Sequence, residues 1–179
     1  MDTDGGGWQL LQKRYNGVQS FSQHFYSYNG GFGNISGEHW LGLYNTKLLL
    51  QFQNKTGYHV ELRIDLRAAD NSTAYAQYNS FSLEDYYYQL AVGDYSGTAG
   101  DSLSAHNGYR FSADYRDFDG NYTVECSKVY DGGWWFNPQC IDGYLNGPYT
   151  KNGTVGMVWP TWRGQEQLVA SVIRLRVTP

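Results

Sequence analysis

Two segments that alternate strictly between apolar and charged residues constrain the fold most. Residues 60–66 read Val-Glu-Leu-Arg-Ile-Asp-Leu, and residues 173–177 read Ile-Arg-Leu-Arg-Val. Because successive side chains of a strand point to opposite faces, this alternation predicts strands with one buried face. Further strands are expected over residues 8–14, 74–81 and 86–92, where β-branched or aromatic residues lie between Gly, Asn and Asp.

One short helix is expected after Ser20. Phe21, Phe25 and Tyr28 have the spacing of one helix face, Ser20 can cap the start, and Asn29-Gly30-Gly31 can end the helix. With the strands, this helix predicts an α+β fold. We expect a mainly antiparallel, twisted sheet with few short helices.

The core must be largely aromatic, because the mean hydropathy of -0.58 leaves few aliphatic residues to fill it. The chain supplies 17 Tyr, 8 Phe and 6 Trp among its 179 residues. A chain of this length is typical of one domain, so a single domain is expected over residues 1–179. Its sheet-rich part is predicted over about 1–92 plus a final strand at 168–177, and its loop-rich part over about 93–167.

The loop-rich part lacks clear periodicity and is dominated by Gly, Asp, Asn and aromatic residues. Its many Trp and Tyr residues argue against disorder. An oxidised pair of Cys126 and Cys140 would stabilise it by roughly 3 kcal/mol. Loops held by a rigid scaffold are where binding sites collect, so we expect the binding site here, ordered by a disulfide and by a metal.

Charge and hydropathy exclude two classes of partner. The net charge is -4 without any basic run, so nucleic acid is not expected. The longest aliphatic run, Leu48-Leu49-Leu50, is far shorter than the ~20 apolar residues that span a bilayer, so membrane insertion is not expected. No signal peptide is visible in the acidic opening residues 1–4.

Glycosylation acceptors point to the extracellular space. Together with the two cysteines, they predict a secreted or cell-surface glycoprotein. The Asn-x-Ser/Thr acceptors are Asn34, Asn54, Asn71, Asn121 and Asn152.

An acidic turn, Asp117-Phe118-Asp119-Gly120-Asn121-Tyr122-Thr123, is the best metal candidate. Two carboxylates are followed by a turn that can aim backbone carbonyl groups at one point, and calcium prefers such oxygen ligands. From spacing alone, a solvated acidic turn is the commoner interpretation.

Catalytic motifs are scarce. The histidines at positions 24, 39, 59 and 106 lack paired metal spacing, and no nucleophile or phosphate-loop motif occurs. A distant carboxylate pair for glycoside hydrolysis remains an alternative of low weight. We therefore expect no enzyme.

The segment between the cysteines carries three consecutive aromatic residues, Trp134, Trp135 and Phe136. One interpretation is that they anchor this segment to the core. The other is that Tyr130 and the backbone beside Cys140 face a ligand.

At this point several motifs, in this order along the sequence, resemble those of the fibrinogen C-terminal domain. The resemblance covers nearly the whole chain and is closest to the ficolin and tachylectin branch of lectins. It implies a secreted recognition domain without enzymatic activity. The motifs are Gly5-Gly-Gly-Trp8, Gly31-Phe-Gly-Asn34, Gly37-Glu-His-Trp-Leu-Gly42, Gly93-Asp-Tyr-Ser-Gly-Thr-Ala-Gly-Asp-Ser-Leu103, His106-Asn-Gly108, Asp117-x-Asp119, Gly132-Gly-Trp-Trp135, Tyr144-Leu-Asn-Gly147 and Trp159-x-x-Trp162.

The resemblance also implies a calcium site. Asp117 and Asp119 fall where the family places its calcium-binding carboxylates. The backbone carbonyl groups of Asn121 and Thr123 become co-ligands, with water completing the shell. The segment from Asp119 to Cys126 is slightly shorter than is usual in the family, which affects the carbonyl assignments most.

A ligand pocket beside the second cysteine is implied as well. In the sugar-binding members, a Tyr four residues after the first cysteine contributes to this pocket, and Tyr130 matches it. Ile141 stands where these members have His, and Gln165 or a neighbour stands where a pocket Trp is expected. A cis peptide before Cys140, as in those lectins, would aim the amides of Cys140 and Ile141 at a ligand. The predicted ligand-binding residues are Tyr130, Gln139, Cys140, Ile141, Tyr149 and Thr154.

Family domains normally begin some tens of residues before Gly5, in a small N-terminal subdomain, so this subdomain is expected to be lacking. The function expected from these features is that of a secreted pattern-recognition lectin in innate immunity. It would bind microbial or host glycans or cell-wall polysaccharide, acetylated sugars among them, with calcium ordering the pocket and oligomerisation supplying avidity. The alternative is a protein-binding module for a cell-surface receptor or matrix partner.

Overall fold

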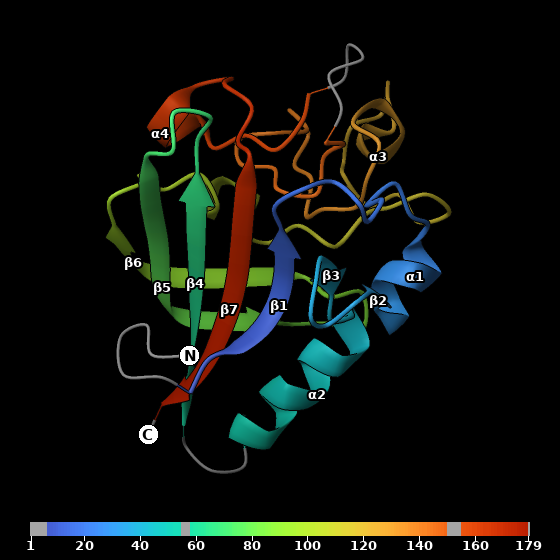
Figure 1. Cartoon of the computed structure of the whole chain (residues 1–179). Helices are drawn as coiled ribbons and strands as arrows, with labels where there is room; N and C mark the ends of the chain where they lie inside the picture. Colours follow the sequence, from blue (N-terminus) through green and yellow to red (C-terminus); the bar gives the residue numbers. More distant parts are fainter. Residues whose placement is uncertain (1–6, 55–57, 150–154, 179) are drawn as a thin grey trace.

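A seven-stranded sheet forms the centre of the computed structural model, which describes residues 7–54, 58–149 and 155–178 (Figure 1). The strand order is β2-β3-β1-β7-β4-β5-β6, and the neighbouring strands pair antiparallel. The predicted α+β class is therefore confirmed. The strands are β1 (Gln9–Arg14), β2 (Phe32–Gly33), β3 (His39–Trp40), β4 (His59–Arg67), β5 (Thr73–Leu83), β6 (Leu90–Gly97) and β7 (Ala170–Thr178).

The two alternating segments lie side by side in the middle of the sheet, as β4 and β7. Ile64 pairs with Ile173 and is completely buried. On the opposite face Arg174 Nη1 lies 2.5 Å from Asp65 Oδ2, so the charged residues pair across the strands where they are half-buried. The alternation thus separates a buried apolar face from a half-buried ladder of ion pairs.

The strand expected over residues 86–92 begins later, at Leu90, and continues to Gly97. The carboxylate of Asp85 accepts hydrogen bonds from the backbone amides of Tyr87 and Gln89, at 2.8 and 3.3 Å. Tyr88 has a φ of 60°, which no strand residue adopts. These local bonds turn the chain before the strand starts.

Helix α1 (Phe25–Gly30) is the helix predicted after Ser20, but it is shorter than expected. Its cap is His24, whose side chain accepts a hydrogen bond from the amide of Ser27. Phe21 lies outside the helix, where its carbonyl oxygen accepts a hydrogen bond of 2.6 Å from the hydroxyl of Tyr28. The apolar spacing therefore reports burial of Phe21 rather than helical structure at that residue.

Helix α2 (Leu43–Asn54) was not predicted. It lies against one face of the sheet and contacts β4 and β5 (Figure 1). Leu43 and Leu50 face the core, whereas Leu48 is 39 % and Leu49 38 % exposed. Exposed leucines blur the amphipathic pattern, so periodicity does not reveal the helix.

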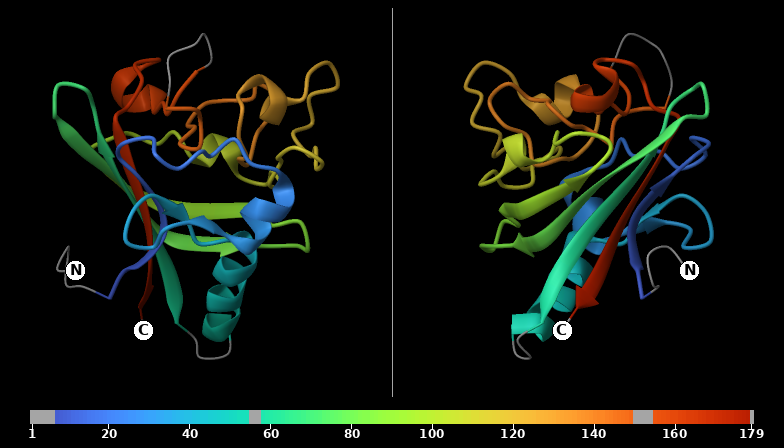
Figure 2. Two further views of the ribbon diagram at one scale, coloured as in Figure 1. Left: turned by 45° about the vertical axis from the view of Figure 1, so that its right-hand side comes forward. Right: turned by 90° about the vertical axis from the view of Figure 1, so that its left-hand side faces the viewer.

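The loop-rich part packs beyond one end of the long strands (Figure 2). In its described residues the helices are short: η2 (Ser104–His106), α3 (Cys126–Val129) and α4 (Pro160–Arg163). Aromatic side chains join it to the sheet in one core. The largest fully buried side chains include Phe21, Tyr28, Trp40, Tyr78, Phe111, Trp134, Phe136, Tyr144 and Trp159.

Candidate binding site

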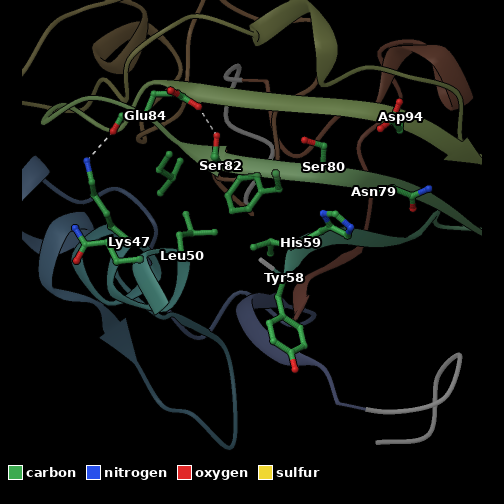
Figure 3. Close-up of a pocket in the computed structure, with 13 residues that line it drawn as sticks. Lys47, Leu50, Tyr58, His59, Asn79, Ser80, Ser82, Glu84 and Asp94 are labelled. Carbon is green, nitrogen blue, oxygen red and sulfur yellow. Dashed lines mark hydrogen bonds between the residues drawn. The ribbon is translucent and has the colours of Figure 1, made fainter. Parts of the chain in front are cut away.

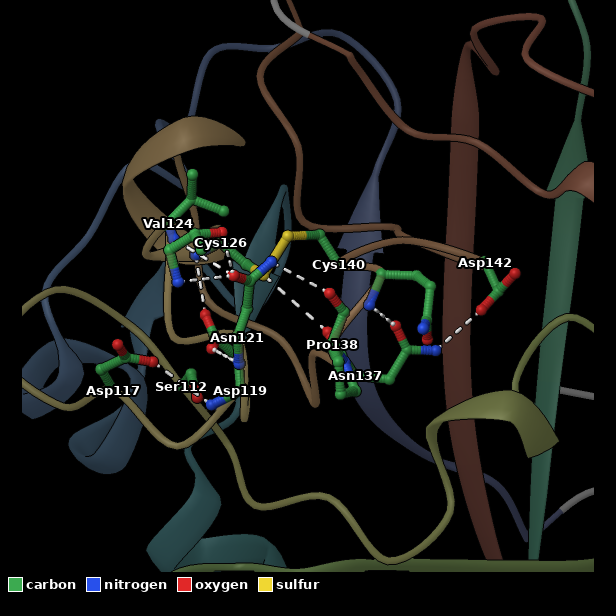
Figure 4. The surroundings of a disulfide bond; sticks show 12 residues. Ser112, Asp117, Asp119, Asn121, Val124, Cys126, Asn137, Pro138, Cys140 and Asp142 are labelled. Atoms are coloured by element: carbon green, nitrogen blue, oxygen red, sulfur yellow. Dashed lines mark hydrogen bonds between the residues drawn. A yellow bond between two sulfur atoms is a disulfide. The ribbon is translucent and has the colours of Figure 1, made fainter.

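The predicted disulfide is present. Cys126, the first residue of α3, is bonded to Cys140, with an S–S distance of 2.09 Å and a Cα–Cα distance of 5.4 Å (Figure 4). Both cysteines are buried. The bond therefore fixes the ends of the segment that was predicted to carry the site.

The three consecutive aromatic residues between the cysteines anchor this segment to the core. Trp134, Trp135 and Phe136 are at most 3 % exposed. The indole nitrogen of Trp135 donates a hydrogen bond of 2.7 Å to the carbonyl oxygen of Tyr88. None of the three rings is therefore available for contact with a ligand.

His106 organises the backbone after Cys140. Its Nδ1 lies 2.8 Å from the carbonyl oxygen of Trp135, and its Nε2 accepts hydrogen bonds from the amides of Asp142 and Gly143, at 3.3 and 3.1 Å. Because Nε2 accepts, Nδ1 carries the proton and donates it to Trp135. Burial lowers the pKa of His106, and the neutral ring is the form that satisfies all three bonds. This histidine is structural.

The chain turns tightly at Cys140 without the cis peptide that the sugar-binding members have before this cysteine. Cis peptide bonds are absent from the described residues, so the bond before Cys140 is trans. Cys140 makes the turn itself, with a φ of 72°. Its amide donates to the carbonyl oxygen of Asn137, and the amide of Ile141 donates to that of Gln139, at 2.8 and 3.1 Å. Both amides are thus bound within the turn instead of facing a ligand.

Tyr130 lies at the edge of a buried aromatic cluster. Its half-buried ring is 6.4 Å from that of Phe136 and 6.3 Å from that of Tyr144, and its carbonyl oxygen accepts a hydrogen bond from the Tyr144 hydroxyl. Gln139 is exposed and Ile141 is half-buried. We call Tyr130, Gln139 and Ile141 the disulfide-loop surface.

The structure assigns Tyr149 another role. Its hydroxyl donates a hydrogen bond to the carbonyl oxygen of Val169, and its ring lies 5.8 Å from the buried guanidinium group of Arg14. Arg14 also donates hydrogen bonds to the carbonyl oxygens of Leu145 and Gly147. Arg14 thus holds residues 145–147 to β1, and Tyr149 bonds the residue that precedes β7, roles that no sequence pattern indicated. Thr154, also predicted, lies outside the described residues.

The acidic turn places the predicted calcium carboxylates next to each other. Asp119 is 1 % exposed, and its carboxylate accepts hydrogen bonds from the amides of Asn121 and Cys126, at 2.7 and 2.8 Å (Figure 4). Asp117 Oδ1 accepts a hydrogen bond of 3.2 Å from the amide of Asp119. Burial and the neighbouring Asp119 carboxylate raise the pKa of Asp117. A cation between the two carboxylates would relieve this repulsion.

The oxygen atoms around the acidic turn are of the kind that calcium prefers as ligands. The side-chain oxygen of Asn121 accepts hydrogen bonds from the amides of Thr123 and Val124 and from the Thr123 hydroxyl, which leaves the backbone carbonyl oxygens of Asn121 and Thr123 as the predicted ligands. In the described part of the protein these two carbonyl oxygens accept no hydrogen bond. Among the described residues, no cluster of three or more His, Cys, Asp or Glu side chains is suited to hold a metal. The resulting set of carboxylates, carbonyl groups and water suits a hard cation.

The glycosylation acceptors differ in accessibility. Asn34 and Asn71 are exposed. Asn121 is half-buried, and its Nδ2 donates a hydrogen bond of 3.0 Å to the carbonyl oxygen of Pro138. The side chain of Asn54 and all of Asn152 lie outside the described residues.

Two of the hollows in the structure contain no residue of the disulfide-loop surface, and the sequence predicted neither. The larger, of about 780 Å³, lies between α2 and strands β4, β5 and β6, with Lys47 and Glu84 at one end (Figure 3). The smaller, of about 460 Å³, lies beside α3. Each is built from segments far apart in the sequence, so no local motif marks it.

In the described residues no helix is long and apolar enough to cross a membrane.

Known proteins of similar sequence match nearly the whole of this chain. "Fibrinogen C domain-containing protein 1" of Macaca fascicularis is 41% identical over 188 residues, which cover 98% of this chain and 42% of that protein. "Fibrinogen-like protein 1" of Homo sapiens is 37% identical, with 99% of this chain and 61% of that protein covered. The chain thus spans less than half the length of the first of these relatives.

Solved structures agree in fold. The fibrinogen-like globe domain of human ANGPTL2 superposes with a TM-score of 0.88 at 36% identity, covering 98% of this chain and 82% of that one. A lamprey fibrin D-dimer in complex with the peptide Gly-His-Arg-Pro-amide gives a TM-score of 0.83 at 30% identity, covering 96% and 62%. The family model for the C-terminal globular domain of fibrinogen beta and gamma chains matches residues 1–179. The protein therefore belongs to the fibrinogen C-terminal domain family.

Proposed function

We propose that this chain is an extracellular binding module without enzymatic activity, and that it binds a peptide or protein at the disulfide-loop surface. The observation that carries the proposal is the engagement of the Cys140 and Ile141 amides within their own turn. A pocket for acetylated sugars that relies on these amides would have to break that turn. Recognition by side chains such as the exposed Gln139 and the half-buried Ile141 suits a peptide better.

The solved relatives support this proposal, because the lamprey fibrin D-dimer was determined with a peptide ligand. Calcium has a supporting role here. Asp119 accepts a hydrogen bond from the amide of Cys126, so a cation held by Asp117 and Asp119 would steady one end of the disulfide segment. The ion would order the surface without touching the ligand.

A secreted lectin of innate immunity is the second candidate. The Tyr130 ring favours it, because a half-exposed aromatic ring at the edge of a rigid cluster can stack on a sugar. Binding through one such ring is weak, so this function requires oligomers for avidity.

The test is a selection from a random peptide library displayed on phage, run beside a glycan array at millimolar calcium. The protein is presented multivalently in both. We expect enriched peptides whose binding is lost in Ile141→Glu and retained in the control Ile35→Glu, which adds the same charge to a side chain that is 69% exposed on another surface. Selective glycan binding that Tyr130→Ala abolishes, without an enriched peptide, would overturn the proposal in favour of the lectin.

A further inference from the structure

The smaller hollow, of about 460 Å³, is formed by three segments that hydrogen bonds hold together. Residues 22–24 form one wall, residues 114–115 a second, and the end of α3 with residues 131–132 a third. The amide of Phe25 donates to the carbonyl oxygen of Asp114 at 3.0 Å, and the hydroxyl of Ser22 donates to Asp131 Oδ1 at 2.5 Å. The hollow is therefore preformed. Helices α1 and α3, which flank it, lie on the same side of the molecule (Figures 1 and 2).

The lining of this hollow carries a net negative charge, because it contains two aspartates and one lysine. Asp114 and Asp131 are both exposed, and neither forms an ion pair with any residue that the structure describes. Lys128 is the cation among the lining residues, and its ammonium group lies 2.7 Å from Glu125 Oε2. Lys128 is paired with Glu125 and also interacts electrostatically with the Asp114 carboxylate. The surplus negative charge of the two aspartates is left to attract a cation from outside.

Exposed aromatic rings lie at one side of the hollow: His24 and Tyr115 line it, and Tyr26 lies next to His24 outside the lining. The ring of His24 lies 6.3 Å from that of Tyr115 and 6.1 Å from that of Tyr26. Tyr115 is 76% and Tyr26 64% exposed, although large aromatic side chains usually pack inward. The faces of such rings attract ammonium and guanidinium groups.

We propose that this hollow binds the cationic side chain of a Lys or Arg residue from a peptide or protein partner. The aliphatic stem of such a side chain would lie against Tyr115, and its charged end would reach Asp114 and Asp131. A hollow of this volume holds one long side chain with its hydration water. The hollow contains none of the residues of the disulfide-loop surface, so the inference does not depend on the function proposed above.

The experiment titrates the 15N-labelled protein, at neutral pH and saturating calcium, with three small probes. N-acetyl-lysine amide and N-acetyl-arginine amide carry the charge, and N-acetyl-norleucine amide keeps the aliphatic stem without it. We expect the two cationic probes to shift the backbone resonances of Gln23, Tyr115 and Lys128, and added salt to weaken their binding. The norleucine probe should cause much smaller shifts.

Asp131→Asn and Asp114→Asn should each weaken binding of the cationic probes about two- to fivefold, as for an exposed charge pair. Asp94→Asn is the matched control, because Asp94 is exposed outside this hollow and shares with Asp131 a φ of 55°. Equal shifts from the norleucine probe, equal weakening in the control, or absence of shifts would each overturn the proposal. Shifts caused by methyl α-glucoside in place of the cationic probes would assign the hollow to a sugar and overturn it as well.

Discussion

His106 should make the folded state sensitive to mild acid. The folded protein holds this ring neutral, with Nδ1 donating to Trp135 and Nε2 accepting from Asp142 and Gly143. Burial lowers its folded pKa, whereas the unfolded state binds the proton near its ordinary value of about 6.5. Below that value the unfolded state holds more protons, so the free energy of unfolding falls by about 1.4 kcal/mol per pH unit until the folded pKa is reached. Above it the stabilisation is fully present.

The assay is urea denaturation followed by tryptophan fluorescence, between about pH 5 and 6.5 at fixed calcium. In this window carboxyl groups whose folded pKa is lowered, such as those of Asp85 and Asp101, stay ionised in both states and contribute little. His106→Gln keeps one donor and one acceptor but cannot titrate. We expect it to be less stable at neutral pH by about 1–3 kcal/mol, with a flatter pH dependence. The reasoning would be refuted if the free energy of unfolding of His106→Gln changed with pH as steeply as that of the wild type. It would also be refuted if His59→Gln, a change at an exposed site, flattened the pH dependence equally.

Three other predictions concern calcium, the disulfide and glycans. Calcium at about 100 times its Kd should raise the Tm by about 5–10 °C, and a shift of equal size in Asp117→Asn would contradict the proposed site. Replacing both cysteines, as Cys126→Ser with Cys140→Ser, should lower the free energy of unfolding by about 3 kcal/mol in the same urea assay, and an unchanged value would show that packing alone holds the segment. In protein secreted from mammalian cells, Asn71→Gln should lower the glycan mass seen by intact mass spectrometry, whereas Asn121→Gln should not, because Asn121 Nδ2 is bound to Pro138. A mass loss in the second variant would show that this bond forms after glycosylation.

Some of the fold follows from local sequence. The alternation in residues 60–66 and 173–177 predicts strands because side-chain direction in a strand has a period of two. The same residues do not say which strands are neighbours. Pairing of β4 with β7 brings together segments about a hundred residues apart, and complementary apolar faces and ion pairs such as Arg174 with Asp65 select it only in three dimensions.

Helix boundaries needed tertiary context. Phe21 matches the spacing of α1, yet it fills the core from outside that helix. Exposed Leu48 and Leu49 conceal α2, whose position depends on the packing of Leu43 and Leu50 against the sheet. Helices in proteins gain most of their stability from such packing, so local propensity places them poorly.

The sequence by itself determined the two strands of alternating pattern, the aromatic core, the cysteine pair and, through its motifs, the family. Only the tertiary structure decided which functional groups are free. It committed the Cys140 amide and Tyr149 to internal hydrogen bonds, and it joined Ser22 to Asp131 across 109 positions of the sequence. The physical reason is that a polar group is free or hydrogen-bonded according to its neighbours in space. Those neighbours come from segments far apart in the sequence, and no local pattern says which segments meet.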